Sequence, residues 1–339
     1  MSAIQVGEVD AAAALLTLPK AELHLHLESS IRPSTATELG DRYGRPMPRD
    51  GPFPGLKEFV AEYEVARDLI GSLDDLRRVA SELVDHAVAQ GVVWSEVHLI
   101  PPSYSGRLGP DEAVLEAVLD GFGHSSGFEP GAGVILGVNR GLPMDAAERS
   151  LKLAVSYADK GVVGLGLAGD ERNNPASRFS GVFARGREAG LPAVPHGGEA
   201  SGAESVRACV EELGASRVCH GVRAVEDPAV VDLLVERGVC IDVCPSSNVS
   251  LQVSPSIEEH PLPLLLEAGV PLTLNSDGPL FSGVSVNDEY RLARMVFSLD
   301  WSVLKRIAQT SLTASSCPDH VRLSALRRIQ NWSPSATPA

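Results

Sequence analysis

The earliest residues whose types and spacing could support chemistry are two histidines, His24 and His26, in the segment AELHLHLE at 21–28. Their strict alternation with leucine predicts a β-strand, because successive strand side chains point to opposite faces. Both imidazoles then point to the same side, where neutral imidazole is a good ligand for zinc. The pair alone also fits a half-buried strand with two hydrogen-bonded histidines. A metal site therefore requires further ligands from distant parts of the chain.

Eight short apolar segments, which alternate with amphipathic segments, predict the elements that must position these histidines. The candidate strands cover 20–27, 92–100, 133–139, 161–168, 191–197, 217–221, 238–244 and 270–277. The candidate helices between them cover 109–123, 143–160, 177–190, 201–214, 227–237 and 258–269. Such alternation is typical of an α/β protein whose parallel strands close into a (β/α)8 TIM-type barrel.

Extra helices are expected at two places in this barrel. Residues 31–90 hold two or three helical segments where one would connect two strands, which predicts a helical insertion over the barrel mouth. Two further helices follow the last strand, at about 285–299 and 302–315. No repeat or linker divides the chain, so we expect one domain, residues 1–339, with its barrel core at about 17–315. The Ser/Pro-rich tail at 331–339 is expected to be disordered.

Composition excludes several classes of partner. The chain of 339 residues has a net charge of −15, whereas nucleic-acid polymers and anionic membranes are bound by clustered Lys and Arg. No apolar run approaches the roughly 20 residues of a membrane span, and residues 1–20 lack the basic region of a signal peptide. The five cysteines form no Cys-x-x-Cys motif and are typical of a reducing compartment. We expect a cytoplasmic protein with a small-molecule ligand; nothing indicates its oligomeric state.

Five polar residues fall where a barrel would bring them together. Functional groups of such barrels lie at the carboxyl ends of strands. His24 and His26 end the first predicted strand, His196 the fifth, His220 the sixth and Asp277 the eighth. Three histidines and one carboxylate suffice for a mononuclear metal site with a position for water, whose pKa the metal lowers towards neutrality. The fourth strand ends without the lysine that often bridges two metals, which favours a single ion.

Two further groups are candidates for proton transfer. Glu199, three residues after His196, is poorly placed to bind the same metal, but a carboxyl group in a dry pocket would hold a proton at neutral pH. It is the candidate general acid, and His220 is the candidate base that takes a proton from water. The alternatives are a structural role for Glu199 in a neighbouring loop and a core position for His220.

Five segments in order resemble the motifs of the adenosine deaminase family. They are LPKAELHLHL at 18–27, LAGDE at 167–171, HGGE at 196–199, HG at 220–221 and SD at 276–277. The resemblance implies a zinc ion bound by His24, His26, His196 and Asp277. It also implies that Glu199 protonates purine N1, that His220 with Asp277 orients and deprotonates the water, and that His26 and Gly169 contact the substrate. Hydroxide attack at C6 and loss of ammonia complete the implied reaction.

Two departures from the family pattern concern the substrate. Adenosine deaminases usually carry Asp-Gly after the His-x-His-Leu segment, whereas this chain has Glu28 and Ser29, which look more like adenine deaminases. Many members also follow the metal-binding aspartate with a second aspartate that contacts N7, and here that residue is Gly278. The segments LAGDE and CPSSN at 244–248 argue against adenine as the substrate, because they look more like the nucleoside-acting branch of the family. The expected substrate is adenosine or 2′-deoxyadenosine, with adenine and modified adenosines as alternatives.

Two rival functions each fit part of the sequence. The glycines of GLGLAG at 164–169 match the dinucleotide-binding fingerprint, but they lie inside a predicted strand and no helix start follows them. A zinc-bound barrel that binds a nucleoside without turnover is the second rival, and the presence of both Glu199 and His220 argues against it. Among the other candidates, His98 could line the pocket or fill the barrel interior, and Phe53, Phe59 and Tyr63 could roof the pocket or pack in the core. The remaining histidines are expected to be structural or solvated: His86, His124, His260 and His320.

Overall fold

Eight parallel strands form a closed barrel in the computed structural model, which describes residues 11–123 and 131–334. The strands are β1 (Lys20–His26), β2 (Val92–Leu99), β3 (Ala132–Asn139), β4 (Val162–Ala168), β5 (Ala193–Gly197), β6 (Arg217–His220), β7 (Cys240–Val243) and β8 (Leu272–Leu274). They are hydrogen-bonded in sequence order, and each neighbouring pair is parallel. The bridge from Leu25 to Asp277 joins β1 to the end of β8 and closes the barrel. The predicted (β/α)8 fold is therefore confirmed.

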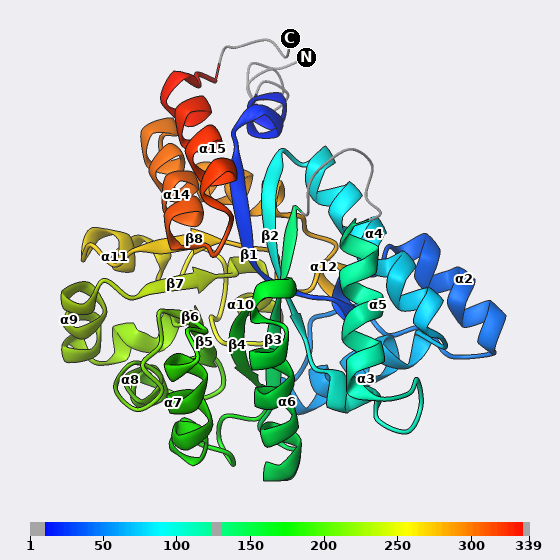
Figure 1. The fold of residues 1–339 in the computed structure, drawn as a ribbon. Helices are drawn as coiled ribbons and strands as arrows, with labels where there is room; N and C mark the ends of the chain where they lie inside the picture. The colour runs from blue at the N-terminus through cyan, green and yellow to red at the C-terminus, as the bar shows by residue number, and fades with distance from the viewer. Residues whose placement is uncertain (1–10, 124–130, 335–339) are drawn as a thin grey trace.

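Helices surround this barrel in the order that the sequence predicts (Figure 1). Helices α2 (Pro33–Tyr43), α3 (Leu56–Leu69) and α4 (Leu73–Ala89) form the predicted insertion between β1 and β2. The connecting helices are α5 (Asp111–Gly123), α6 (Met144–Ser156), α7 (Ser180–Glu188), α8 (Ala203–Glu211), α9 (Pro228–Arg237), and the pair α10 (Pro245–Ser250) and α11 (Leu262–Glu267). After β8 come α12 (Pro279–Ser282), α13 (Val286–Met295), α14 (Trp301–Ala314) and α15 (Asp319–Asn331).

The structure corrects two details of this prediction. Helix α15 follows the two helices expected after the last strand and reaches Asn331, the first residue of the expected tail. Strands β7 and β8 are shorter than the predicted 238–244 and 270–277. Gly238 has a left-handed backbone (φ 62°) and ends α9, and Pro271 lacks the N–H that a strand would use. Residues 335–339 of the expected tail lie outside the described part of the chain, as does His124.

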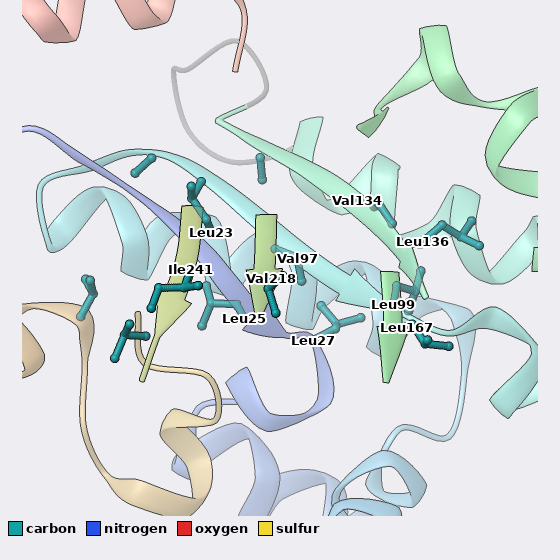
Figure 2. Packing of buried hydrophobic residues seen from close by; sticks show 14 of the residues in the cluster. Leu23, Leu25, Leu27, Val97, Leu99, Val134, Leu136, Leu167, Val218 and Ile241 are labelled. Atoms are coloured by element: carbon teal, nitrogen blue, oxygen red, sulfur yellow. The ribbon is translucent and has the colours of Figure 1, made fainter. Parts of the chain in front are cut away.

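Two apolar layers hold the barrel and its helices together. The leucines of β1 belong to the large cluster between sheet and helices, together with residues such as Val97, Leu136 and Ile241 (Figure 2). A separate small cluster joins Ile135, Val194 and Cys219, which come from strands β3, β5 and β6. Because β3 is no neighbour of β5 or β6, these side chains meet across the barrel interior. The histidines of β1 alternate with its leucines and therefore point inward.

The glycines of β4 make room inside the barrel. A Cβ on Gly166 would lie 3.0 Å from His98 Nδ1 and 2.9 Å from Ile135 Cγ2. A Cβ on Gly164 would meet Ile135 Cδ1 at 2.7 Å. Both glycines lie within a strand and serve its packing, so the dinucleotide-binding interpretation is excluded by its structural context. Among the described residues, no helix combines the length and apolar character that crossing a membrane requires.

Candidate active site

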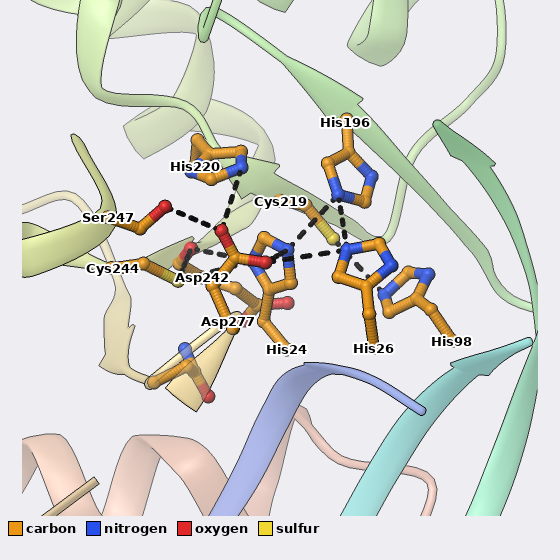
Figure 3. Close-up of polar contacts among 12 residues, drawn as sticks. His24, His26, His98, His196, Cys219, His220, Asp242, Cys244, Ser247 and Asp277 are labelled. Atoms are coloured by element: carbon orange, nitrogen blue, oxygen red, sulfur yellow. Dashed lines mark hydrogen bonds and ion pairs between the residues drawn. The ribbon is translucent and has the colours of Figure 1, made fainter. Parts of the chain in front are cut away.

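The structure brings the five predicted residues together at the carboxyl ends of the strands (Figure 3). His24 and His26 come from β1, His196 from β5, His220 ends β6, and Asp277 lies three residues after β8. His220 and Asp277 have left-handed backbones, with φ of 64° and 59°. This conformation costs about 1–3 kcal/mol for a residue other than glycine and is found mainly at functional sites.

Four ligand atoms surround one point. His196 Nε2 lies 3.1 Å from both His24 Nε2 and His26 Nε2. Asp277 Oδ1 lies 3.5 Å from the same two nitrogens. His24 is fully buried, and the side chain of His26 is 12% exposed towards the cavity described below. The four residues thus present three imidazoles and one carboxylate to a shared centre.

The ring nitrogens show that a cation fits this centre. His196 Nδ1 faces the carbonyl oxygen of Leu167 at 3.0 Å, and His24 Nδ1 faces that of Asp242 at 3.4 Å. Because a carbonyl only accepts, both Nδ1 atoms carry the ring proton and both Nε2 atoms present lone pairs. Burial lowers the pKa of these histidines, that of His26 to about 4, so a second ring proton is absent near neutral pH. Lone pairs 3.1 Å apart repel unless a cation lies between them, so this donor set fits a divalent metal ion.

Cys244 offers a second grouping of potential ligands, with His24 and His220. Its Sγ lies 3.4 Å from His24 Nδ1, the ring nitrogen that already faces a carbonyl oxygen. Burial raises the pKa of the Cys244 thiol well above its ordinary value, which disfavours the thiolate that binds metals. This grouping also lacks a carboxylate. The grouping with Asp277 is therefore the better candidate.

Glu199 lies beside this centre, in a loop that a carboxylate from the preceding strand's loop holds in place. The Glu171 carboxylate accepts backbone N–H bonds from Glu199 (3.2 Å) and Ser201 (2.7 Å), which fixes the loop after β5. Glu199 Oε1 lies 3.5 Å from His220 Nε2. Burial, followed by the negative charges of Asp277 and Glu171, raises the pKa of Glu199 well above its ordinary value. The surroundings of Glu199 therefore favour its protonated form, which is the form that a general acid uses.

His220 and the second oxygen of Asp277 complete the polar cluster. His220 Nε2 lies 4.0 Å from Asp277 Oδ2, which also accepts a 2.7 Å hydrogen bond from Ser247 Oγ. His220 Nδ1 lies 3.1 Å from Asn248 Nδ2. Burial lowers the pKa of His220 to about 3, so the ring is neutral. A neutral ring between Glu199 and Asp277 can exchange hydrogen bonds with a water molecule placed there.

A cavity of about 640 Å³ opens above these residues. His26, His196, Glu199, His220 and Asp277 line its floor. Its walls come from the loop after β4 and from α3, including Gly169, Asp170, Leu56, Phe59 and Tyr63. Phe53 is buried and packs against Phe59, so this aromatic group serves both as cavity wall and as core. The predicted insertion thus contributes side chains above the strand ends.

Glu28 and Gly278, two candidate substrate contacts, are not among the residues that line this cavity. The buried Glu28 carboxylate accepts hydrogen bonds from the hydroxyls of Tyr63 and Tyr104, the latter at 2.6 Å. Burial and the charge of Glu28 raise the pKa of both tyrosines well above the ordinary value, so both remain donors. Glu28 therefore reaches the cavity through Tyr63. The Cα of Gly278 faces Ser29 and Phe281.

Several residues of the site carry no separate signal in the sequence. Glu171 and Asn248 lie within the segments LAGDE and CPSSN, but their partners only become evident in three dimensions. His260, which was expected to be structural or solvated, is a buried partner of Asn248, and the sequence did not indicate that partner. His98 fills the barrel interior, where its ring stacks on His26 at 4.9 Å between centroids. His86 is exposed on α4.

Comparisons with known proteins agree with this geometry. The family model described as adenosine deaminase matches residues 19–332. A putative adenosine/adenine deaminase of Streptomyces virginiae is 41% identical over 332 residues, which cover 94% of this chain and 97% of that protein. The crystal structure of an adenine deaminase from Arthrobacter aurescens superposes with a TM-score of 0.86 at 28% identity, covering 93% of this chain and 98% of the other. A zinc-bound amidohydrolase from Burkholderia ambifaria shares the fold, with a TM-score of 0.84 at 24% identity and coverage of 98% and 93%. The chain belongs to the adenosine deaminase family and is a hydrolytic deaminase of aminopurines.

Proposed function

We propose that the protein deaminates adenosine or 2′-deoxyadenosine at a single zinc ion held by His24, His26, His196 and Asp277. The observation that carries the proposal is the convergence of imidazole lone pairs and one carboxylate beside the buried Glu199, at the floor of a 640 Å³ cavity. The zinc in the structurally similar amidohydrolase supports the choice of metal. When bound, zinc would lower the pKa of a water molecule and make it a nucleophile at neutral pH.

Side chains of the protein would carry out the proton transfers of the reaction. Glu199 would donate its proton to purine N1, which makes C6 more electrophilic. His220 and Asp277, whose facing atoms lie 4.0 Å apart, would orient the attacking water and handle its proton. Addition of water at C6 and departure of the amino group as ammonia then leave the 6-oxopurine. The backbone of Gly169, which is left-handed (φ 103°), would border the ring from the cavity wall.

The cavity is roomy enough to favour a nucleoside over a bare base, because pockets of about 300–1,000 Å³ accommodate drug-sized ligands. Glu28 does not enter it, so nothing at that position excludes a ribose. Adenine is the second candidate, because Glu28 is not among the residues that line the cavity and therefore offers no acceptor to a ribose hydroxyl there. The adenine deaminase among the similar structures supports this alternative.

Ammonia release by the zinc-loaded protein tests the proposal. The panel contains adenosine, 2′-deoxyadenosine, adenine, 5′-modified adenosines and 7-substituted analogues. We expect turnover of the nucleosides and a decrease in kcat of about 10²–10⁴-fold in Glu199→Gln, which keeps the shape of the side chain but cannot transfer a proton. Glu236→Gln, at an exposed position of α9 that does not line the cavity, is the matched control and should retain activity. Turnover of adenine alone would select the second candidate, and binding without ammonia release from any member would refute deamination.

A further inference from the structure

Three buried polar side chains form a hydrogen-bonded chain that leads from helix α11 to His220. The backbone N–H of Leu262, the first residue of α11, donates to His260 Nδ1 at 3.1 Å. His260 Nε2 lies 3.0 Å from Asn248 Oδ1, and Asn248 Nδ2 lies 3.1 Å from His220 Nδ1. His260, Asn248 and His220 are 3%, 0% and 1% exposed, so water does not compete for these bonds.

The donor and the acceptor of each hydrogen bond in this series follow from the first bond, which the backbone N–H of Leu262 donates. A backbone N–H can only donate, so His260 Nδ1 accepts and the ring proton lies on Nε2. His260 Nε2 then donates to the Asn248 oxygen, which places the Asn248 amide nitrogen against His220. That nitrogen can only donate, so His220 Nδ1 accepts. The opposite orientation of the Asn248 amide would set two N–H donors against each other at His260.

The backbone around Asn248 supports this orientation. Its carbonyl oxygen accepts hydrogen bonds from Val253 N–H at 2.8 Å and Ser254 N–H at 3.1 Å. The backbone of Asn248 is therefore fixed within α10, and only its side-chain amide could rotate. Burial lowers the pKa of His260 to about 4, in agreement with a neutral ring that has one N–H.

We propose that His260 is a positioning residue, which acts through Asn248 to fix His220 in the tautomer with its proton on Nε2. This inference rests on the proposed function. His220 then presents an N–H, and not a lone pair, to the space shared with Glu199 Oε1 (3.5 Å) and Asp277 Oδ2 (4.0 Å). A water molecule there would accept a hydrogen bond from His220, so His220 orients the nucleophile, and the removal of its proton falls to Asp277. Under this proposal His220 is a hydrogen-bond donor to the water, whereas the sequence suggested a base.

Nitrogen NMR of the histidine rings tests the tautomer directly. Long-range ¹H–¹⁵N spectra of the zinc-loaded protein distinguish Nε2–H from Nδ1–H, and the His220 signals are assigned by their loss in His220→Asn. We expect Nε2–H in the wild-type protein and Nδ1–H in Asn248→Asp, because a carboxylate cannot donate to Nδ1. His260→Leu should release the fixed tautomer, and His260→Gln, whose amide can donate to Asn248, should restore it. The exposed His86→Gln is the control and should leave the His220 signals unchanged.

Kinetics provide the second readout. His260→Leu should lower kcat about tenfold or more, as loss of a buried orienting partner does, while KM changes much less. His260→Gln should recover most of kcat. A wild-type His220 with its proton on Nδ1, or a tautomer unaffected by both His260→Leu and Asn248→Asp, would overturn the proposal. Because the spectra require no substrate, this test is independent of which aminopurine is deaminated, and wild-type data alone decide the tautomer if a variant fails to fold.

Discussion

Ser29 and Gly278, two positions where the sequence departs from the family pattern, contact each other in the structure. A Cβ on Gly278 would lie 3.2 Å from Ser29 Cβ, 3.3 Å from Ser29 Oγ and 3.3 Å from Phe281 Cδ2. The φ of Gly278 is −131°, which any residue adopts, so crowding and not backbone strain opposes a side chain there. Gly278→Ala should therefore cost about 1–2 kcal/mol of unfolding free energy through overpacking.

Ser29→Gly should relieve that crowding at a cost of its own. Ser29 Oγ lies 3.2 Å from the carbonyl oxygens of both His26 and Asp277. Its loss removes a hydrogen bond of about 1 kcal/mol and adds about 0.5–1 kcal/mol of glycine backbone entropy. In the double variant two of the three close contacts are gone. The double variant should thus be less destabilised than the sum of the single variants, by about 1 kcal/mol.

Urea unfolding of the four zinc-loaded proteins measures this interaction energy, provided that their m-values agree. If the destabilisation of the double variant equals the sum for the two single variants to within about 0.5 kcal/mol, the contact between Ser29 and a Cβ at position 278 does not cause the destabilisation of Gly278→Ala. The same geometry predicts that Gly278→Asp is accommodated only together with Ser29→Gly. Glycine and aspartate are the residues that the family pattern places at these two positions, so we infer that the two departures compensate each other.

Three further predictions concern stability. Glu28→Ala leaves the buried hydroxyl of Tyr104 and the partly buried hydroxyl of Tyr63 without their acceptor and should lower the free energy of unfolding by about 2–5 kcal/mol, measured in urea. Burial raises the pKa of Glu289 to about 8, so its contribution to the stability of the fold is complete below about pH 4.5 and is lost as the pH rises through 8. The Tm of Glu289→Gln minus the Tm of the wild type should therefore be larger at pH 8.5 than at pH 5. An equal difference at the two pH values would contradict this. Chelation should lower Tm because it leaves the imidazole lone pairs facing each other, and added zinc should restore Tm; an unchanged Tm would argue against a bound metal.

Hydrophobic periodicity made most of the barrel predictable. The tendency of functional groups to lie at the carboxyl ends of barrel strands predicted where the candidate site would be. In β1 the leucines and histidines alternate, so they point to opposite faces of the strand, as the sequence alone predicts. The ends of the later strands were less predictable, because Pro192 and Pro271 remove strand N–H groups and delay β5 and β8 relative to the apolar pattern. The convergence of His196, His220 and Asp277 was nevertheless predictable, because a closed parallel barrel brings the carboxyl ends of its strands together.

The supporting residues could not be found in this way, because their partners are distant in sequence. Glu28 meets Tyr63 and Tyr104, which follow it by 35 and 76 residues. No periodicity connects such positions, and a polar side chain in a loop or helix is more often exposed than buried. A glutamate in place of aspartate therefore suggested a substrate contact, whereas the structure shows a carboxylate that holds a tyrosine at the cavity wall.

Closure of the barrel and assembly of the site depend on the same residues. Asp277 N–H donates to the His24 carbonyl at 3.1 Å, and His26 N–H donates to the Asp277 carbonyl at 3.2 Å, so the bridge that joins β8 to β1 also sets the aspartate beside both histidines. The left-handed backbone of Asp277 costs about 1–3 kcal/mol and persists only where neighbours over-determine it. The two backbone bonds and the Ser247 hydroxyl provide that constraint. Asp277 is both the residue that closes the barrel and a candidate metal ligand. Binding of a metal would therefore stabilise the barrel at the junction between β8 and β1.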